Sequence, residues 1–183
     1  MKTWIALLRG VNVVGKRKLP MKDLSAILQK AGFSGVRTYI QSGNVVFQSS
    51  RGSAQTLAAR IAQSILGRFG FAPQVMVLSG PRLAAAIRGN PFPGADADPR
   101  SLHLFFLSEH PPDPDLKSLA RLKSGREAFA LKAGVFYLHT PDGFADSAVQ
   151  GKVERFLGVP ATARNWRTVN QLLQMSLGLA SPE

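Results

Sequence analysis

The residues best suited to chemistry form a glycine-containing loop near the start of the chain. Residues 10–16 read GVNVVGK and lie between a strand-like run and a helix-like segment, which is the spacing and context of a Walker A phosphate-binding loop. Arg17 stands where that loop needs the Ser or Thr that binds Mg²⁺. The β-branched Val11, Val13 and Val14 also disfavour the positive φ angles that aim several N–H groups at one phosphate. The sequence therefore argues against a nucleotide-binding P-loop.

The same loop fits a more general anion site. Four cations surround it: Arg9, Lys16, Arg17 and Lys18. A predicted helix follows at Pro20, and the N-terminus of a helix carries partial positive charge that favours an anion. The alternative interpretation is that these cations are only solvated surface groups.

A second set of polar residues is expected beside this loop. Residues 36–41 and 45–48 are β-rich runs separated by Ser42-Gly43-Asn44, which predicts a hairpin. If the first and third strands are antiparallel neighbours, the end of the first lies beside the start of the third. Two groups then meet at one edge of the sheet: Arg9, Gly10 and Asn12 with Gln41, Ser42, Gly43 and Asn44. The alternative is that Ser42 and Asn44 only satisfy a tight turn.

The net charge is concentrated in the first half of the chain. Residues 1–95 hold 13 Lys and Arg and one acidic side chain, Asp23, so they carry the whole formal charge of +12. Residues 96–183 hold 10 basic and 10 acidic side chains. This asymmetry favours a phosphate-bearing partner, nucleic acid among the candidates. The alternative is that the excess of basic residues only keeps the protein soluble.

Catalytic groups are scarce near the loop. The first half has no histidine, and Asp23 is its one carboxylate. Acylphosphatases consist of a single ferredoxin-like βαββαβ unit, called a plait. They hold phosphate in the loop after the first strand and position water with an asparagine, and Asn44 is the analogous candidate here. Their glutamine-glycine-valine loop signature is absent. Whether the chain is an enzyme stays open, and the alternative function is an enzyme acting on a phosphorylated or acyl-phosphate substrate.

The second half offers weaker candidates. Its three histidines are His103, His110 and His139. Their spacing matches no zinc signature and the chain has no cysteine, so we expect no metal site and no cofactor. Residues 162–168 place Arg164 and Asn165 at a predicted helix start, where they either bind a ligand or, in the case of Asn165, cap the helix above a buried Trp166.

The elements that position these residues follow the order βαββαβ in the first half. Apolar strand-like runs lie at residues 3–8, 36–41, 45–48 and 74–78. Helical spacing runs from Met21 to Ala31 before Gly32, and from an N-cap at Ser53 to Gly70. This order is that of a ferredoxin-like plait. The strands lack the glycine-aromatic signature of RNA-recognition plaits, so a nucleic acid would be held by phosphate contacts.

The pattern then restarts at an offset of about 90 to 98 residues. After a short helix from Pro81 to Arg88, the predicted elements are a strand at 101–107, a helix opened by Asp113-Pro114, a hairpin of 127–131 and 135–139, a helix over 149–157, a strand at 161–164 and a final helix from Trp166. We therefore predict an α+β protein of two tandem ferredoxin-like plaits packed together, with an extra C-terminal helix. The expected boundaries are 1–90, a linker at 91–100, and 101–183.

Composition excludes several classes of protein. The 183 residues are 45% hydrophobic, which is typical of a globular core and excludes disorder or collagen-like arrays. No apolar run is long enough to span a membrane, and no signal peptide is recognisable, so we expect a cytoplasmic protein without a membrane partner.

The first strands of both halves are apolar on both faces. The helices of a plait cover only one face of its sheet, so the other face must be covered by the second plait, by extra helices or by a partner chain. A protein-interaction module is therefore a third alternative.

Several segments together resemble a known family. They are residues 6–15 (ALLRGVNVVG), 20–21, 38–47 (TYIQSGNVVF), 90–92 and 162–169 (TARNWRTV). They are similar to a widespread bacterial domain-of-unknown-function family, number sixteen ninety-seven. The resemblance implies two tandem ferredoxin-like plaits and no established activity. The family's loop usually ends in Gly-Gly, and this chain has Val14 at the first of those positions.

Overall fold

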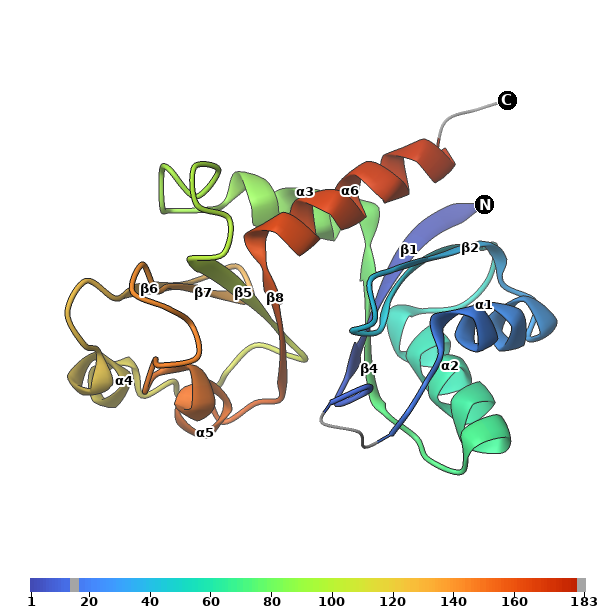
Figure 1. Cartoon of the computed structure of the whole chain (residues 1–183), viewed down its shortest axis with the longest axis horizontal. Helices are drawn as coiled ribbons and strands as arrows, with labels where there is room; N and C mark the ends of the chain where they lie inside the picture. Colours follow the sequence, from blue (N-terminus) through green and yellow to red (C-terminus); the bar gives the residue numbers. More distant parts are fainter. Residues whose placement is uncertain (14–16, 181–183) are drawn as a thin grey trace. The chain divides into compact units, whose positions relative to one another are not determined.

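The computed structural model describes residues 1–13 and 17–180 and shows an α+β protein with two four-stranded antiparallel sheets (Figure 1). The described residues form six α-helices and one short 3₁₀ helix around these sheets. By its internal contacts the chain divides into two units, Met1–Ala84 with the residues from Gln171 onward, and Ala85–Asn170.

The first unit contains the order expected from the sequence. Its elements are β1 (Lys2–Arg9), α1 (Met21–Lys30), β2 (Ser34–Tyr39), β3 (Asn44–Ser49), α2 (Ala54–Phe69) and β4 (Gln74–Ser79). The strand order in the sheet is β2-β3-β1-β4, so β1 and β3 are central antiparallel neighbours as predicted. The predicted hairpin and the Ser53 N-cap are also confirmed, since Ser53 accepts a hydrogen bond from the backbone N–H of Thr56.

Helices α1 and α2 cover one face of this sheet, which we call the helix face (Figure 1). Apolar residues at helical spacing, such as Leu24 and Leu28 in α1 and Ile61 in α2, are fully buried there against Ala6 and Leu8 of β1. On the second face, Ile5 and Leu7 are also fully buried. The expectation that both faces of the first strand are covered is therefore confirmed.

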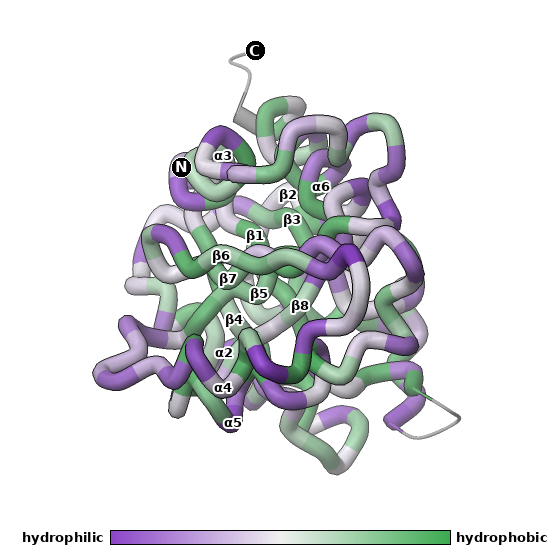
Figure 2. Tube along the Cα trace, turned by 90° about the vertical axis from the view of Figure 1, so that its left-hand side faces the viewer, coloured by the Kyte–Doolittle hydropathy of each residue, from purple (hydrophilic) through white to green (hydrophobic). Residues whose placement is uncertain are grey.

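The second unit repeats the sheet order. Its elements are β5 (Leu102–Leu107), α4 (Leu116–Leu122), β6 (Ala128–Lys132), β7 (Val135–His139), a 3₁₀ turn (Gln150–Lys152), α5 (Val153–Leu157) and β8 (Ala161–Asn165), in a sheet of order β6-β7-β5-β8. Strands β5 and β7 are largely hydrophobic along their length (Figure 2). Phe105 and Leu107 of β5 pack with α4 and α5 residues in one core cluster.

Two predicted helices of the second half differ in detail. The helix expected to open at Asp113-Pro114 begins instead at Leu116, because the Asp115 carboxylate accepts the backbone N–H of Ser118 at 2.9 Å and caps it there. The helix expected over residues 149–157 is a 3₁₀ turn followed by α5. It ends at Gly158, as predicted, with a left-handed φ of 72°.

The remaining helices are α3 (Gly80–Arg88) and α6 (Trp166–Ala180), and the boundaries between the units fall within both. The division predicted from the sequence places the whole last helix with residues 101–183. In the structure its later part groups with the first unit, because the Leu179 carbonyl accepts a hydrogen bond from Gln48 of β3 and the Leu179 side chain lies against Gly35 of β2. No helix in the described part of the chain combines the length and apolar character that crossing a membrane requires.

Candidate functional site

The loop after β1 and the β2–β3 hairpin meet at one edge of the first sheet, as the topology predicts. Leu7 pairs with Asn44, and the Leu8 N–H donates to the Gly43 carbonyl at 2.8 Å. We call this place the basic edge and define it by Arg9, Gly10, Asn12, Arg17, Lys18 and residues 41–44. Lys16, the fourth predicted cation, and Val14 lie outside the described residues.

Asn12 connects the loop to the hairpin. Its side-chain amide donates to the Leu19 carbonyl at 2.9 Å and to the Gln41 carbonyl at 2.7 Å, and its Oδ1 accepts the Leu19 N–H at 2.7 Å. The backbone N–H of Asn12 donates to the Arg17 carbonyl at 3.2 Å. Both amide hydrogens are thus used within the protein, so Asn12 fixes the shape of the edge from within.

Gly43 and Asn44 also have structural roles. A Cβ at Gly43 would lie 2.7 Å from Leu8 Cβ and from Val11 Cγ2, so only glycine lets the hairpin approach β1 this closely. Asn44 is 0% exposed, and its amide donates to the Tyr39 carbonyl and to Ser42 Oγ. In this conformation Asn44 has no access to solvent. The enzyme alternative therefore lacks the water-positioning group that it assigned to this residue.

The described cations of the edge are exposed. Arg9 ends β1, and its Nη1 donates to Gln74 Oε1 at 3.2 Å. Arg17 adopts a left-handed φ of 51°. Its Nη1 lies 3.5 Å from the point that a Cβ atom at position 10 would occupy, so the guanidinium group lies close to Gly10. Lys18 follows directly and is exposed, as is Gln41. Arg9 and Arg17 thus flank the same glycine on a loop that Asn12 holds in place.

Arg164 and Asn165 belong to β8 of the second unit. Asn165 pairs with His103 and Arg164 with Leu104, so successive side chains point to opposite faces of that sheet. The Arg164 guanidinium donates to the Ala163 carbonyl at 2.8 Å, and burial lowers the pKa of Arg164 to about 10. The sheet therefore lies between the two side chains.

Asn165 is the N-cap of α6. Its Oδ1 accepts the backbone N–H of Thr168 at 2.8 Å, and Trp166 beside it is buried with its indole N–H donating to Asp96 at 2.7 Å. This is the capping alternative that the sequence left open.

Replacing Asn165 by alanine is expected to destabilise the second unit by about 1 kcal/mol, because α6 loses its N-cap. Urea denaturation followed by circular dichroism measures the change. Asn165→Ser should retain most of the stability, because serine also caps helices. Equal stability of the alanine variant and the wild type would show that the cap contributes nothing.

A small cavity of about 330 Å³ in the second unit surrounds His103 and had no counterpart in the sequence predictions. The polar residues lining it are Asp98, Arg100, Ser101, His103, Thr140 and Asn165. The imidazole stacks on Phe144 with ring centroids 3.6 Å apart, and its Nδ1 is buried without a partner among the described residues. Burial lowers the pKa of His103 to about 4, so the ring is neutral at neutral pH.

The lowered pKa of His103 predicts an acid-sensitive stability. The unfolded chain takes up a proton near pH 6.5, but the folded protein resists it until about pH 4, so stability falls as the pH drops through that interval. We expect a loss of about 2 kcal/mol between pH 7 and pH 5 from this group. Urea denaturation of the wild type and of His103→Phe at pH 7 and at pH 5 measures the free energy of unfolding. In the variant, the part of the pH dependence that comes from His103 should be absent. An unchanged pH dependence in that variant would contradict the assignment.

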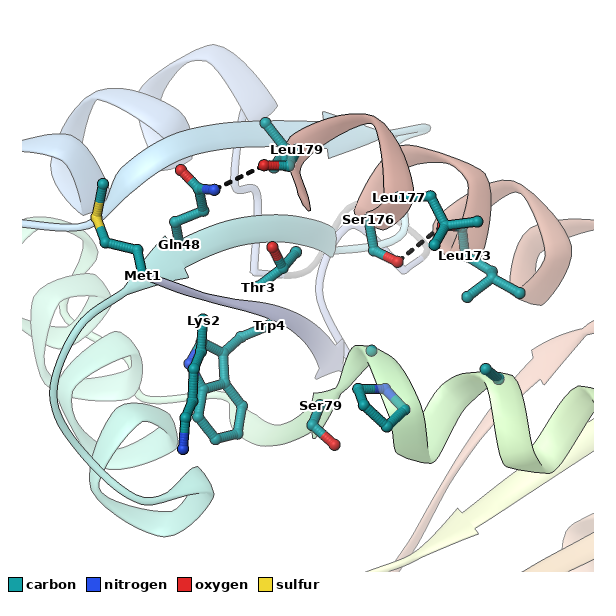
Figure 3. Close-up of a pocket in the computed structure, with 13 residues that line it drawn as sticks. Met1, Lys2, Thr3, Trp4, Gln48, Ser79, Leu173, Ser176, Leu177 and Leu179 are labelled. Carbon is teal, nitrogen blue, oxygen red and sulfur yellow. Dashed lines mark hydrogen bonds between the residues drawn. The ribbon is translucent and has the colours of Figure 1, made fainter. Parts of the chain in front are cut away.

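The larger cavity, of about 840 Å³, lies in the first unit on the side of β1 where β4 has ended (Figure 3). The register of β1 with β4 begins at Trp4, which pairs with Ser79, so Lys2 and Thr3 have no β4 neighbour. The chain turns into α3 at Gly80, and the end of α6 lies across the gap. We call this space the apolar cavity. Sequence patterns do not reveal it, since four separate segments line it.

No group of three or more His, Asp or Glu side chains among residues 1–13 and 17–180 is arranged to hold a metal ion.

Comparison with known proteins places the chain in a family. The family model described as protein of unknown function (DUF1697) matches residues 1–137, and the chain belongs to that family. The structure is similar to that of the conserved bacterial protein SP0830 from Streptococcus pneumoniae, with 25% sequence identity and a TM-score of 0.70, over 95% of this chain and 98% of that one. No curated protein matches the chain. The predicted family resemblance is thus confirmed.

Proposed function

We propose that this protein binds a phosphate-bearing anion at the basic edge through Arg9, Arg17 and Lys18. The observation that carries the proposal is the Asn12 bridge, which joins Asn12 and Leu19 to the hairpin at Gln41. Backbone that is already held in place loses little conformational entropy on binding, so the cations close to these residues contribute more to affinity than cations on mobile backbone do. The anion is either a nucleic acid backbone or a smaller phosphorylated molecule.

The electrostatic surroundings support this proposal. Asp23 is the single acidic side chain in residues 1–95, and those residues carry the whole net charge of +12. Cations of the same unit outside the edge, such as Lys30, Arg37 and Arg51, are exposed as well. A field of one sign over a unit attracts polyanions and raises their local concentration.

We also infer that each unit is a ferredoxin-like plait. Both sheets have the same order, with the first and third strands of each unit as central antiparallel neighbours. In both units the carbonyl of a hairpin glycine accepts a hydrogen bond from the backbone N–H of a residue near the end of the first strand. Leu8 donates to Gly43, and Leu107 donates to Gly134. A tandem duplication of one unit accounts for this correspondence.

A salt series of binding measurements tests the proposal. The probes are single-stranded RNA, double-stranded DNA and pyrophosphate, and the variant is Arg9→Gln/Arg17→Gln/Lys18→Gln. For a nucleic acid, the slope of log K against log salt should be shallower in the variant by about 2 to 3, since three phosphate contacts are lost. For pyrophosphate, affinity should fall at least about tenfold.

A control variant with the same net charge separates the edge from general attraction. Lys30→Gln/Arg37→Gln/Arg51→Gln removes three exposed cations that lie outside the basic edge. This variant should keep most of the wild-type affinity. If both triple variants lose the same affinity, binding follows net charge and the basic edge is not a site. If no probe binds at low salt, the proposal fails.

A further inference from the structure

The apolar cavity exists because the sheet is incomplete at one corner. Strand β4 stops at Ser79, opposite Trp4, and the following residues form α3. The open edge at the start of β1 therefore faces the first turn of α3, and the end of α6 lies over the sheet face to which Thr3 points (Figure 3). Its volume of about 840 Å³ lies within the range of small-molecule sites.

The walls of this cavity are mainly apolar. The apolar side chains come from the start of β1, α3 and α6: Met1, Trp4, Pro81, Ala84, Leu173, Leu177 and Leu179. Leu177 remains 53% exposed and Met1 78% exposed, so large apolar groups meet water at this place. An apolar ligand that covers them would gain free energy from the surface removed from water.

The charge at the cavity has one sign. None of the thirteen lining residues is acidic, and Lys2 is a cation that is exposed beside the cavity. Several polar groups of the wall are already used within the protein, because Gln48 donates to the Leu179 carbonyl and Ser176 to the Leu173 carbonyl. Lys2 is therefore the lining group best able to select a ligand by charge.

We propose that the apolar cavity binds a small amphipathic anion. The apolar part of the ligand, such as a medium-length acyl chain, lies against Leu173, Leu177 and Ala84 and passes around the edge of β1 that β4 leaves open. Its acidic group then pairs with Lys2, whose side chain points, like that of Trp4, to the opposite face of β1 (Figure 3). This site involves none of the residues of the basic edge, so each of the two proposals can be tested independently of the other.

The two tryptophans of the chain allow a direct test. Trp4 lines the apolar cavity and Trp166 lies in the second unit, so Trp166→Phe leaves Trp4 as the single fluorophore. The probe is 10-bromodecanoate, whose bromine quenches an indole on contact. We expect saturable quenching in Trp166→Phe and little quenching in Trp4→Phe. Quenching of Trp166 alone, or of neither residue, would overturn the proposal.

Variants of the wall locate the ligand. Ala84→Phe fills the space and should weaken decanoate binding at least about tenfold, whereas Ala59→Phe, on the exposed surface of α2, should leave it unchanged. Leu177→Ser tests the wall at an exposed position that tolerates substitution and should weaken binding a few-fold. If Ala84→Phe and Leu177→Ser both bind as the wild type does, the ligand lies elsewhere and the proposal is wrong.

Charge selectivity tests the role of Lys2. Lys2→Gln should weaken the binding of decanoate about three- to tenfold and leave the binding of decanol unchanged. Lys22→Gln, an exposed lysine of α1 outside the cavity, is the matched control. Equal affinity of wild-type protein for decanoate and decanol would overturn the assignment of an anionic ligand. Concentration-dependent dimerisation that Ala84→Phe abolishes and decanoate does not affect would show that a second copy fills the cavity instead.

Discussion

Gly43→Ala is expected to destabilise the first unit by about 3 kcal/mol, and Gly43→Val is expected to prevent its folding. The new Cβ would lie 2.7 Å from Leu8 Cβ and Val11 Cγ2, well inside carbon–carbon contact distance. Leu8 and Val11 are buried in the core, so neither can move aside without opening it. The left-handed φ of 73° adds a further cost for any side chain. Chemical denaturation measures the effect.

Gly70 supplies a matched control for this prediction. It has the same φ of 73°, it caps α2 in the same unit, and a Cβ there would meet nothing within 4 Å. Gly70→Ala should therefore cost about 1 kcal/mol, which is the conformational term alone. A similar loss in both alanine variants would mean that the close approach of the hairpin to β1 is not what requires glycine at position 43.

Asn12→Asp is expected to destabilise the loop and hairpin by about 4 kcal/mol. Asn12 donates to two carbonyl oxygens, of Leu19 and Gln41, at 2.9 and 2.7 Å. A carboxylate has no hydrogen to donate and would face both oxygens with negative charge, so two hydrogen bonds become repulsive contacts. Urea denaturation at neutral pH measures the loss, and lowering the pH toward the pKa of the new carboxyl should restore part of it.

Asn12→Gly separates the backbone from the side chain at this position. Asn12 has a left-handed φ of 56°, which glycine adopts without strain, so this variant loses only the three side-chain hydrogen bonds. We expect a smaller loss, of about 2 kcal/mol, together with weaker anion binding because the loop is no longer held. Stability of Asn12→Asp equal to that of the wild type would contradict the bridging role.

The sequence predicts the elements of this protein well because its apolar spacing and end signals agree. Ser53 caps α2 where a serine precedes the helical pattern, and Gly70 and Gly158 end helices in the left-handed conformation that glycine favours. The meeting of the β1 loop with the hairpin also follows from topology alone. The predicted start of α4 is wrong by two residues. Asp113 and Asp115 are both suitable N-caps in the sequence, and in the structure Asp115 caps the helix.

The roles of the polar residues could not be predicted in the same way. Asn12 and Asn44 have the residue types of ligand-binding groups, but their amides are occupied by backbone carbonyls that no spacing rule identifies. Arg164 and Asn165 are candidates in the sequence because they place a cation and an amide at a predicted helix start. A strand sends adjacent side chains to opposite faces, so the pleat of β8 separates them.

Both cavities also lie beyond what sequence patterns reveal. His103 is enclosed by residues from the segment before β5, the loop after β7 and the end of β8. The apolar cavity depends on where β4 stops relative to β1, and on the last helix returning to the first unit. Each depends on register and long-range contacts, which local periodicity does not encode.

The most direct test of the basic edge is an amide chemical-shift titration of the wild-type protein with pyrophosphate and with a short single-stranded RNA. We expect the largest shifts at low salt on Gly10, Arg17, Lys18, Gln41 and Ser42, and we expect added salt to reverse them. Shifts that are absent, or that gather on residues outside the edge such as Lys30 and Arg51, would contradict the proposal.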